Sequence, residues 1–203
     1  MAFLALYELF DLCRFEKVLL KERLMKAKMT TKQLVQIAMI AAIYAVLTAI
    51  FSSISFTPLQ LRLSEIMVFL AYFNPIYIIG LTLGCFIVNI LMSPYLLMDG
   101  VFGTLATFLS VSAIYYTAKA FKGSKKGLIV ASIWPTIING LIVGWIIYTC
   151  SIAEGSMTKD IAALVGLMGN VAFGEFIVVS IIGVPVVYFI MSRYQSVIKK
   201  LTK

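Results

Sequence analysis

The stretch Pro58-Leu59-Gln60-Leu61-Arg62-Leu63-Ser64-Glu65 places an arginine and a carboxylate three residues apart in a very apolar part of the chain. The next five residues, Ile66-Met67-Val68-Phe69-Leu70, carry no charge. Charges at the edge of a membrane segment are costly, so they usually face a partner or a cavity. If the stretch is helical, Arg62 and Glu65 share one helix face. Two interpretations stay open: a structural ion pair that fixes a loop to the bundle, or one wall of a polar ligand site.

The composition indicates an integral membrane protein embedded in a lipid bilayer. Of the 203 residues, 62% are hydrophobic, whereas soluble domains are typically about 45–50% apolar. The formal net charge is +8. The basic residues lie at the ends of apolar segments and in the N-terminal leader, which argues against nucleic-acid binding. Histidine is absent, and this removes most zinc chemistry and histidine-based catalysis. We therefore expect no metal, no cofactor and no enzyme activity.

Six apolar segments predict an all-α bundle of six transmembrane helices. The expected spans are residues 33–51, 59–73, 76–92, 101–118, 128–148 and 169–192. Asn74-Pro75 and Ser93-Pro94 end the second and third spans, because the residue before a proline leaves the helical region. Asp99 is placed as the N-cap of the fourth span, with a ligand role as the alternative. Residues 161–192 are too long for one straight span, so we expect a short outer segment before the sixth.

The distribution of Lys and Arg orients this bundle. Residues 1–32 hold seven of them, the turn 119–126 four and residues 193–203 four. With six spans these segments share one side, and the two remaining residues, Arg62 and Lys159, lie on the other. The positive-inside rule then predicts a multi-pass protein of the cell membrane with both termini cytoplasmic.

The first 30 residues are interpreted as a leader, and residues 31–203 as a single membrane domain. Acidic residues interrupt the apolar run of the leader, so it is neither a transmembrane span nor a signal peptide. It is either an amphipathic helix on the inner leaflet, or a segment that is not made because translation starts at Met25 or Met29.

Small residues recur at four-residue spacing in the first span. The pairs are Ala38–Ala42, Ala41–Ala45 and Ala45–Ala49. Such a ridge lets another helix approach closely, which is how helices associate in lipid. Alanine is common in membrane spans, but three overlapping pairs favour a packing face.

Polar side chains from several spans are expected to converge in the bundle. Those of the outer half are Arg62, Glu65, Asp99, Asn170 and Glu175, and those near mid-depth are Asn89 and Asn139. Glu175 has no basic neighbour one turn away, so it must be protonated, paired across the bundle or bound to a ligand. A carboxylate accepts from the two adjacent N–H groups of a guanine-like base, and asparagine offers a donor and an acceptor. Trp134, Trp145 and Tyr148 either stack on a flat heterocycle or anchor the protein in lipid.

No segment of the sequence supplies energy for transport. There is no Gly-rich phosphate-binding loop followed by Lys and Ser or Thr, no carboxylate–histidine relay and no obvious internal repeat. A compact binder with an alanine ridge and no motor suggests a subunit that captures a solute and is driven by partners.

Five stretches occur in a characteristic order along the membrane region. They are Leu59-Gln60-Leu61-Arg62-Leu63-Ser64-Glu65, Gly84-Cys85-Phe86-Ile87-Val88-Asn89, Asp99-Gly100-Val101-Phe102-Gly103-Thr104-Leu105-Ala106-Thr107, Ile138-Asn139-Gly140-Leu141-Ile142-Val143-Gly144 and Gly174-Glu175. With this order the region resembles the substrate-binding S components of energy-coupling factor (ECF) transporters, and most closely the QueT family of queuosine-precursor transporters. The family usually shows Asn-Ala where this chain has Asn139-Gly140. It commonly has a second carboxylate late in the fifth span, where this chain has Trp145-Ile146-Ile147.

The resemblance implies six helices, an outward-facing pocket and a small-molecule solute, a 7-deazaguanine such as preQ0, preQ1 or queuine. It also implies docking through Ala38, Ala42 and Ala45 onto a transmembrane coupling protein that two cytoplasmic ATPases drive. The rival functions are an S component for another vitamin-like heterocycle and a non-transport scaffold of the envelope. An intramembrane enzyme is disfavoured, because no span contains a nucleophile–base pair.

Our hypothesis for the site assigns one role to each polar residue. Glu175 and Asn139 would hold the edge of the base. Arg62, Glu65 and Asp99 would shape the outer gate, where Glu65 or Asp99 would meet a cationic side arm.

Overall fold

The computed structural model describes residues 29–57 and 59–193. The predicted leader up to residue 28, Pro58 and the basic tail 194–203 lie outside the described residues. By internal contacts the chain divides into two units, Met1–Val35 and Gln36–Lys203. In the described part of the first unit, Thr30 and Gln33 form a reciprocal capping box, with Thr30 N–Gln33 Oε1 at 2.9 Å and Gln33 N–Thr30 Oγ1 at 3.3 Å. This pair satisfies open amides at the start of the first helix.

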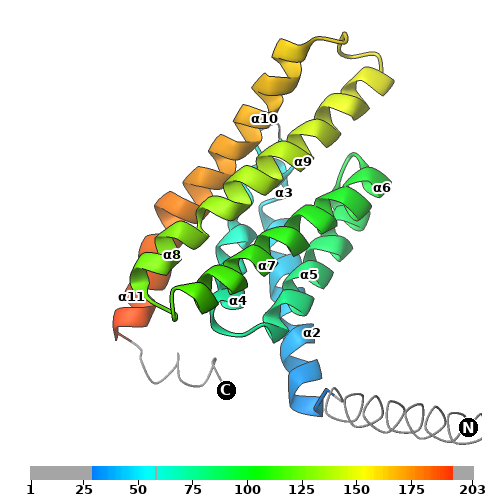
Figure 1. Cartoon of the computed structure of the whole chain (residues 1–203). Coiled ribbons are helices and arrows are strands. Elements are labelled where there is room, and N and C mark those ends of the chain that lie inside the picture. The colour runs from blue at the N-terminus through cyan, green and yellow to red at the C-terminus, as the bar shows by residue number, and fades with distance from the viewer. Residues whose placement is uncertain (1–28, 58, 194–203) are drawn as a thin grey trace, which may run out of the picture. The chain divides into compact units, whose positions relative to one another are not determined.

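The described residues fold into helices and contain no strand (Figure 1). Labels with α are α-helices, η1 is a 3₁₀ helix, and η2 and η3 are π-helical stretches. In chain order they are α2 (Thr31–Ile50), α3 (Ser52–Ser55), η1 (Leu63–Phe69), α4 (Leu70–Phe73), α5 (Ile76–Met92), α6 (Leu96–Met98), η2 (Asp99–Gly103), α7 (Thr104–Ala120), α8 (Lys125–Ala131), α9 (Ile133–Ala153), α10 (Ile161–Glu175), η3 (Phe176–Gly183) and α11 (Val184–Arg193).

Four helical stretches are long and apolar enough to cross a membrane. They are Thr31–Ile50, Leu96–Ala120, Lys125–Ala153 and Ile161–Arg193, and two shorter apolar helices are Leu63–Phe73 and Ile76–Met92. The 33 residues of the last stretch extend about 50 Å as a helix, well beyond a hydrocarbon core of about 30 Å. Such a stretch must tilt or project from the bilayer.

The predicted ends of the second and third spans are confirmed. α4 ends at Phe73 and α5 covers Ile76–Met92, as the proline rule indicated. Asn74 closes the turn, because its side-chain Oδ1 accepts a hydrogen bond from Ile76 N at 3.1 Å.

The second predicted span, 59–73, was wrong in its first part. Arg62 has extended backbone angles, φ −89° and ψ 95°, and the helix starts only at Leu63. Gln60 has a positive φ of 48°, which a helix does not allow. Residues 59–62 therefore form a non-helical strap, and Arg62 and Glu65 do not share a helix face.

Two further expectations were wrong at helix ends. Asp99 is not an N-cap, since the helix already begins at Leu96 and Asp99 opens its π-helical part. Residues 161–193 form one continuous helix rather than an outer segment followed by a separate span. Membrane helices tolerate glycine, because neighbouring groups and local π-type adjustments satisfy the backbone. Glu175 therefore lies 14 residues into this helix, deeper than predicted.

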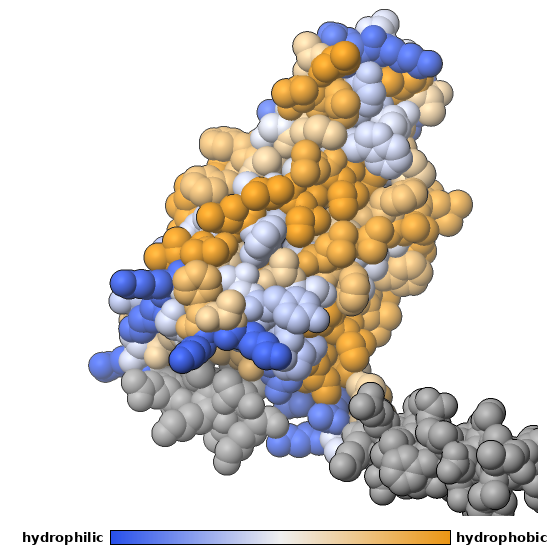
Figure 2. All heavy atoms as spheres, in the orientation of Figure 1, coloured by the Kyte–Doolittle hydropathy of each residue, from blue (hydrophilic) through white to orange (hydrophobic). Residues whose placement is uncertain are grey.

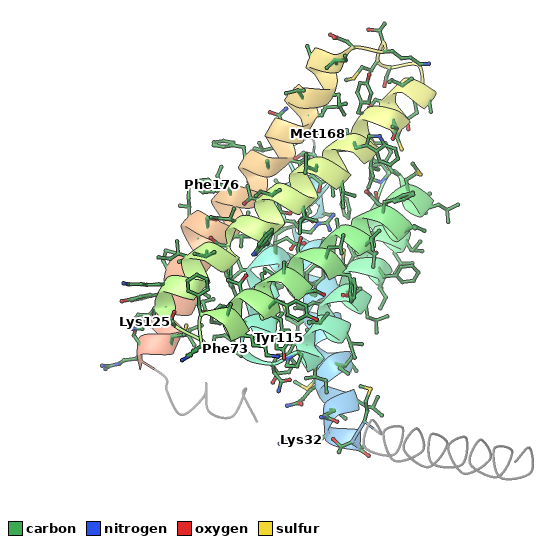
Figure 3. The ribbon with its side chains drawn as sticks, viewed as in Figure 1. Lys32, Phe73, Tyr115, Lys125, Met168 and Phe176 are labelled. Atoms are coloured by element: carbon green, nitrogen blue, oxygen red, sulfur yellow. The ribbon has the colours of Figure 1, made fainter. Side chains whose placement is uncertain are left out.

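Glycines let the helices approach closely at two crossings. On α5, a Cβ at Gly80 would lie 2.9 Å from the carbonyl oxygen of Ile37, and one at Gly84 would lie 2.9 Å from that of Ala41. On α9, a Cβ at Gly144 would lie 2.5 Å from the Cα of Met168 on α10 (Figure 3). Small residues at a helix interface are typical of packing in lipid.

Apolar side chains fill two clusters and also cover the outside. The larger cluster includes Tyr44, Phe69, Cys85 and Ile114, and the smaller includes Val143 and Val171. Figure 2 shows hydrophobic side chains over the visible face between two hydrophilic ends. Many of these outer side chains are more than half exposed, which suits a lipid environment.

The start of α8 contacts the end of α11 at one end of the bundle. Lys125, at the start of α8, donates to Ser192 Oγ at 2.6 Å and lies 4.2 Å from the centre of the Tyr188 ring on α11. The lysine-rich turn 119–126 and the end of α11 therefore lie on the same side, as the charge count required.

Candidate functional site

A polar pocket lies inside the helical bundle. Its wall contains Gln60, Arg62, Asn89, Asp99, Gly103, Thr107, Asn139, Val143 and Glu175. These residues come from the strap and from α5, η2, α7, α9 and α10. Polar and charged side chains are thus brought together from six elements within an apolar protein, where each must be hydrogen-bonded or serve a function.

Glu175 and Asn139 form a hydrogen-bonded pair across the bundle. Asn139 Nδ2 on α9 donates to Glu175 Oε1 on α10 at 2.7 Å. Both side chains are 3% exposed, yet Glu175 Oε2 and Asn139 Oδ1 have no hydrogen-bond partner among the described residues. The pair therefore presents two free acceptor oxygens at one place in the pocket wall.

Gly174 allows the strap to lie directly against α10. A Cβ at Gly174 would lie 1.7 Å from the carbonyl oxygen of Leu59, although Cβ atoms essentially never lie within 3.0 Å of another heavy atom. The strap reaches this contact with Gln60 in a left-handed conformation. Gly174 and Glu175 thus act together: the glycine admits the strap, and the carboxylate meets the pocket that the strap closes.

Arg62 extends from the strap into the interior. Its Nη1 lies 3.7 Å from Cys85 Sγ on α5, and its guanidinium carbon is 5.2 Å from the centre of the Phe56 ring. Cys85 Sγ is also 3.1 Å from Thr107 Oγ1. Arg62 is only 7% exposed, and its Nε has no hydrogen-bond partner in the described part of the chain.

Asp99 is held by two neighbours. The hydroxyl of Ser93 donates to its carboxylate, and Asn89 Nδ2 donates to its backbone carbonyl at 2.9 Å. Asn89 Oδ1 has no partner within the described residues. These contacts fix the first π-helical turn and keep the Asp99 carboxylate, 2% exposed, in the pocket wall.

Glu65 lies behind the pocket and contacts α2. Tyr44 on α2 donates its hydroxyl to Glu65 Oε1 at 2.5 Å, and Thr48 Oγ1 and Ser64 Oγ lie 2.6 Å apart beside it. Within the described part of the chain, Glu65 Oε2 and Arg62 Nε both lack hydrogen-bond partners, so the expected Arg62–Glu65 pair is not hydrogen-bonded through these atoms. Glu65 is part of a buried polar contact between α2 and η1 and does not line the pocket.

A second hollow adjoins the first. It is lined by Phe56, Thr57, Gln60, Pro94, Tyr95, Asp99 and Ile147. Gln60 and Asp99 belong to both walls, so they mark the boundary between the two. The hollows hold about 260 and 230 Å³ of space between atoms. Much of this space is narrower than a water molecule, so the strap or its neighbours must shift to admit a heterocyclic base.

Both π-helical stretches adjoin pocket carboxylates. Asp99 is the first residue of η2, and Glu175 immediately precedes η3. A π-helical turn re-aims the side chains around it, and such turns are frequent at functional sites. Phe176, the next residue after Glu175, is 44% exposed and points away from the bundle (Figure 3).

The structure does not bring every predicted residue to the pocket. Asn170 is exposed on α10. Trp134 and Trp145 are 39% and 38% exposed and line neither hollow. Trp134 Nε1 donates to Thr117 Oγ1 at 2.9 Å, and Trp145 packs edge-on against Phe102. The positions of the two tryptophans favour the alternative interpretation, in which they pack and anchor the protein in lipid.

Several residues of the site or its surroundings were missed, among them Tyr44, Gln60, Cys85 and Thr107. Gln60, Cys85 and Thr107 lie within the stretches that carried the family resemblance, which was the available signal. Tyr44 had a weaker one, because it is the only tyrosine in the alanine-rich helix α2.

Ala38, Ala42 and Ala45 keep an accessible position. Ala38 and Ala42 are exposed and Ala45 is half-buried, whereas Ala41 is buried against Gly84. α2 therefore uses one small residue to pack inside the bundle and presents others on its outer face.

The comparisons with known proteins identify the family of the chain. A curated relative, the queuosine precursor transporter QueT of Lactococcus lactis subsp. cremoris (strain MG1363), is 41% identical over 93 residues, which are 44% of this chain and 54% of the relative. The aligned part of the chain thus spans about half the length of that relative. No solved structure matches the chain. The pattern of the QueT transporter family matches residues 34–192, and the chain therefore belongs to this family.

Proposed function

We propose that this chain is the substrate-binding membrane subunit of an ECF-type importer and that its solute is a 7-deazaguanine precursor of queuosine. Family membership and the resemblance to ECF S components support the transport class. The printed name of the Lactococcus relative supports the substrate class. In this proposal the chain itself is not an enzyme, and ATP hydrolysis belongs to partner subunits.

The buried Asn139–Glu175 pair carries the substrate proposal. Glu175 Oε2 and Asn139 Oδ1 lack hydrogen-bond partners among the residues that the structure describes, although both side chains are buried. Leaving such acceptors unpaired costs about 1–3 kcal/mol each, more for a charged group. The N1–H and exocyclic amine of a guanine-like base are adjacent donors, and a carboxylate accepts from two such groups. A base edge bound at Glu175 would remove this cost.

The proposed topology has six spans, both termini in the cytoplasm and the pocket open to the outer side. Leu63–Phe73 and Ile76–Met92 are shorter than the other four candidates, and we assign them as the second and third spans. The basic residues at the α8–α11 end favour the cytoplasm for that end. α2 would dock on the transmembrane coupling protein through Ala38, Ala42 and Ala45, and two cytoplasmic ATPases would drive the complex.

Ligand-induced thermal stabilisation of the purified protein in detergent tests the proposal. The panel contains preQ0, preQ1, queuine, guanine and several B vitamins. A ligand that binds the folded state raises the melting temperature according to its concentration relative to its Kd. We expect a shift with at least one 7-deazaguanine and none with the vitamins. A shift with a vitamin alone would replace the substrate class, and no shift with any solute would favour a non-transport scaffold.

A further inference from the structure

We propose that the pocket selects a 7-deazaguanine whose 7-substituent carries a protonated amine, and that Asp99 is the counter-charge for that amine. This inference rests on the proposed function and narrows its substrate class. It separates aminomethyl-type precursors from the neutral 7-cyano compound.

Among the described residues, the fully buried side-chain atoms of the pocket wall that lack a hydrogen-bond partner are mostly acceptors. In the part of the chain that the structure describes, three acceptor oxygens of the wall have no hydrogen-bond partner: Glu175 Oε2, Asn139 Oδ1 and Asn89 Oδ1. Within the same described part of the wall, Arg62 Nε is the one fully buried donor without a partner. A ligand that satisfies this wall must bring more donors than acceptors. The edge of the base supplies two N–H groups, and an ammonium group supplies three more. A nitrile supplies only an acceptor.

The formal charges of the pocket wall also favour a positively charged ligand. Asp99 and Glu175 are carboxylates, and among the described residues Arg62 is the one cationic side chain that lines the pocket. Glu65, three residues after Arg62 in the chain, is a third buried carboxylate. All four groups are nearly fully buried, where an uncompensated charge is expensive. A cationic ligand reduces the negative excess, and a neutral one does not.

The position of Asp99 assigns it to the substituent rather than to the base. Asp99 and Gln60 lie at the boundary between the two hollows, whereas Asn139 and Glu175 line only one of them. A base held at the Asn139–Glu175 pair can extend its substituent across this boundary. Ser93 and Asn89 hold Asp99 in place, so its carboxylate is oriented before the ligand binds.

The test compares three ligands of nearly equal size. Dissociation constants of the full chain in detergent are measured for 7-aminomethyl-, 7-hydroxymethyl- and 7-cyano-7-deazaguanine. The hydroxymethyl compound has the shape of the aminomethyl compound without its charge. We expect the aminomethyl compound to bind about 10- to 100-fold more tightly than either neutral one, the range that one charge-assisted hydrogen bond provides.

Asp99→Asn identifies the counter-charge. We expect it to remove the preference, so that the affinity ratio of the aminomethyl to the hydroxymethyl compound falls by about 10- to 100-fold. Residual binding of either compound shows that the variant is folded. Asp99→Glu keeps the charge and should retain most of the preference, so it serves if Asp99→Asn does not fold. Glu154→Gln is the matched control, because it removes an exposed carboxylate that lines neither hollow.

The outcomes separate this inference from the proposed function. Equal affinity of the wild-type chain for all three compounds would overturn the amine selection and leave the substrate class intact. Binding of none of them would overturn both. A preference for the amine that persists in a folded Asp99→Asn variant would remove Asp99 from the assignment.

Discussion

Gly174→Ala is a one-carbon change whose effect follows from the contact between α10 and the strap. The new Cβ would lie 1.7 Å from Leu59 O and 2.9 Å from Leu59 C, both backbone atoms. Backbone cannot rotate aside as a flexible side chain can, so the strap must move by more than 1 Å. Arg62 and Gln60 belong to the strap and line the pocket. The variant should therefore lose ligand affinity as well as stability.

The size of the effect is measured against a matched glycine in the same helix. Gly166 has no heavy atom within 4 Å of a built Cβ, so Gly166→Ala tests helix propensity alone, which favours alanine by about 1 kcal/mol. Overpacking typically costs about 1–3 kcal/mol. Both variants gain this propensity, so they should differ by the overpacking cost alone, about 1–3 kcal/mol. Each kcal/mol corresponds to about 2–4 °C in melting temperature for a chain of this size.

Thermal unfolding in detergent measures the melting temperature of each variant. Repeating it with the ligand found in the solute panel measures the ligand affinity. We expect Gly166→Ala to bind like the wild type, and Gly174→Ala to melt lower and bind at least 10-fold more weakly. If the two variants melt together and bind equally, the strap does not depend on Gly174, and its place in the pocket wall is wrong.

Two further substitutions test other contacts. Tyr44→Phe removes the hydroxyl that donates to Glu65, and the unpaired buried carboxylate should lower the free energy of unfolding by about 1–3 kcal/mol; an unchanged melting temperature would show that the contact contributes nothing. Ala42→Leu places a large side chain on the exposed face of α2, and in the proposed importer it should block solute uptake and co-purification of the coupling protein while solute binding by the isolated chain stays normal. Normal uptake by this variant would move the docking surface elsewhere.

Local signals in the sequence were sufficient for much of the fold. Asn74-Pro75 and Ser93-Pro94 located the ends of two helices because proline acts on its immediate neighbours. The charge count predicted that the turn 119–126 and the C-terminal end lie on the same side, because it depends only on the order of the spans. The cost of a lone carboxylate in a membrane helix predicted that Glu175 is protonated, paired across the bundle or bound to a ligand, and in the structure it accepts from Asn139.

The errors occurred where a distant contact decides the local conformation. The strap at residues 59–62 reads as part of an apolar helix, and its extended form depends on Gly174, more than a hundred residues later. Asp99 was taken as a cap because capping is a local rule, but its carboxylate accepts from Ser93 instead. The glycines after Ile161 suggested a break, whereas the helix continues through a π-helical stretch.

The missed and misplaced site residues have the same explanation. Glu65 was assigned to the gate from its position in the sequence, but its partner Tyr44 is on another helix. Asn170 and Glu175 are close in sequence on α10. Asn170 is exposed and Glu175 is buried, because they lie on different faces of the helix. Residue type alone does not indicate which of the two side chains is buried.

The affinity of Glu175→Gln tests the central claim, that the Asn139–Glu175 pair holds the edge of the solute. Glutamine keeps the oxygen that accepts from Asn139 and replaces the free acceptor by an amide donor. The account predicts binding of the 7-deazaguanine that is about 10- to 100-fold weaker, with the exposed Glu154→Gln variant unchanged. Equal affinity of Glu175→Gln and wild type would contradict the account and place the solute elsewhere in the bundle.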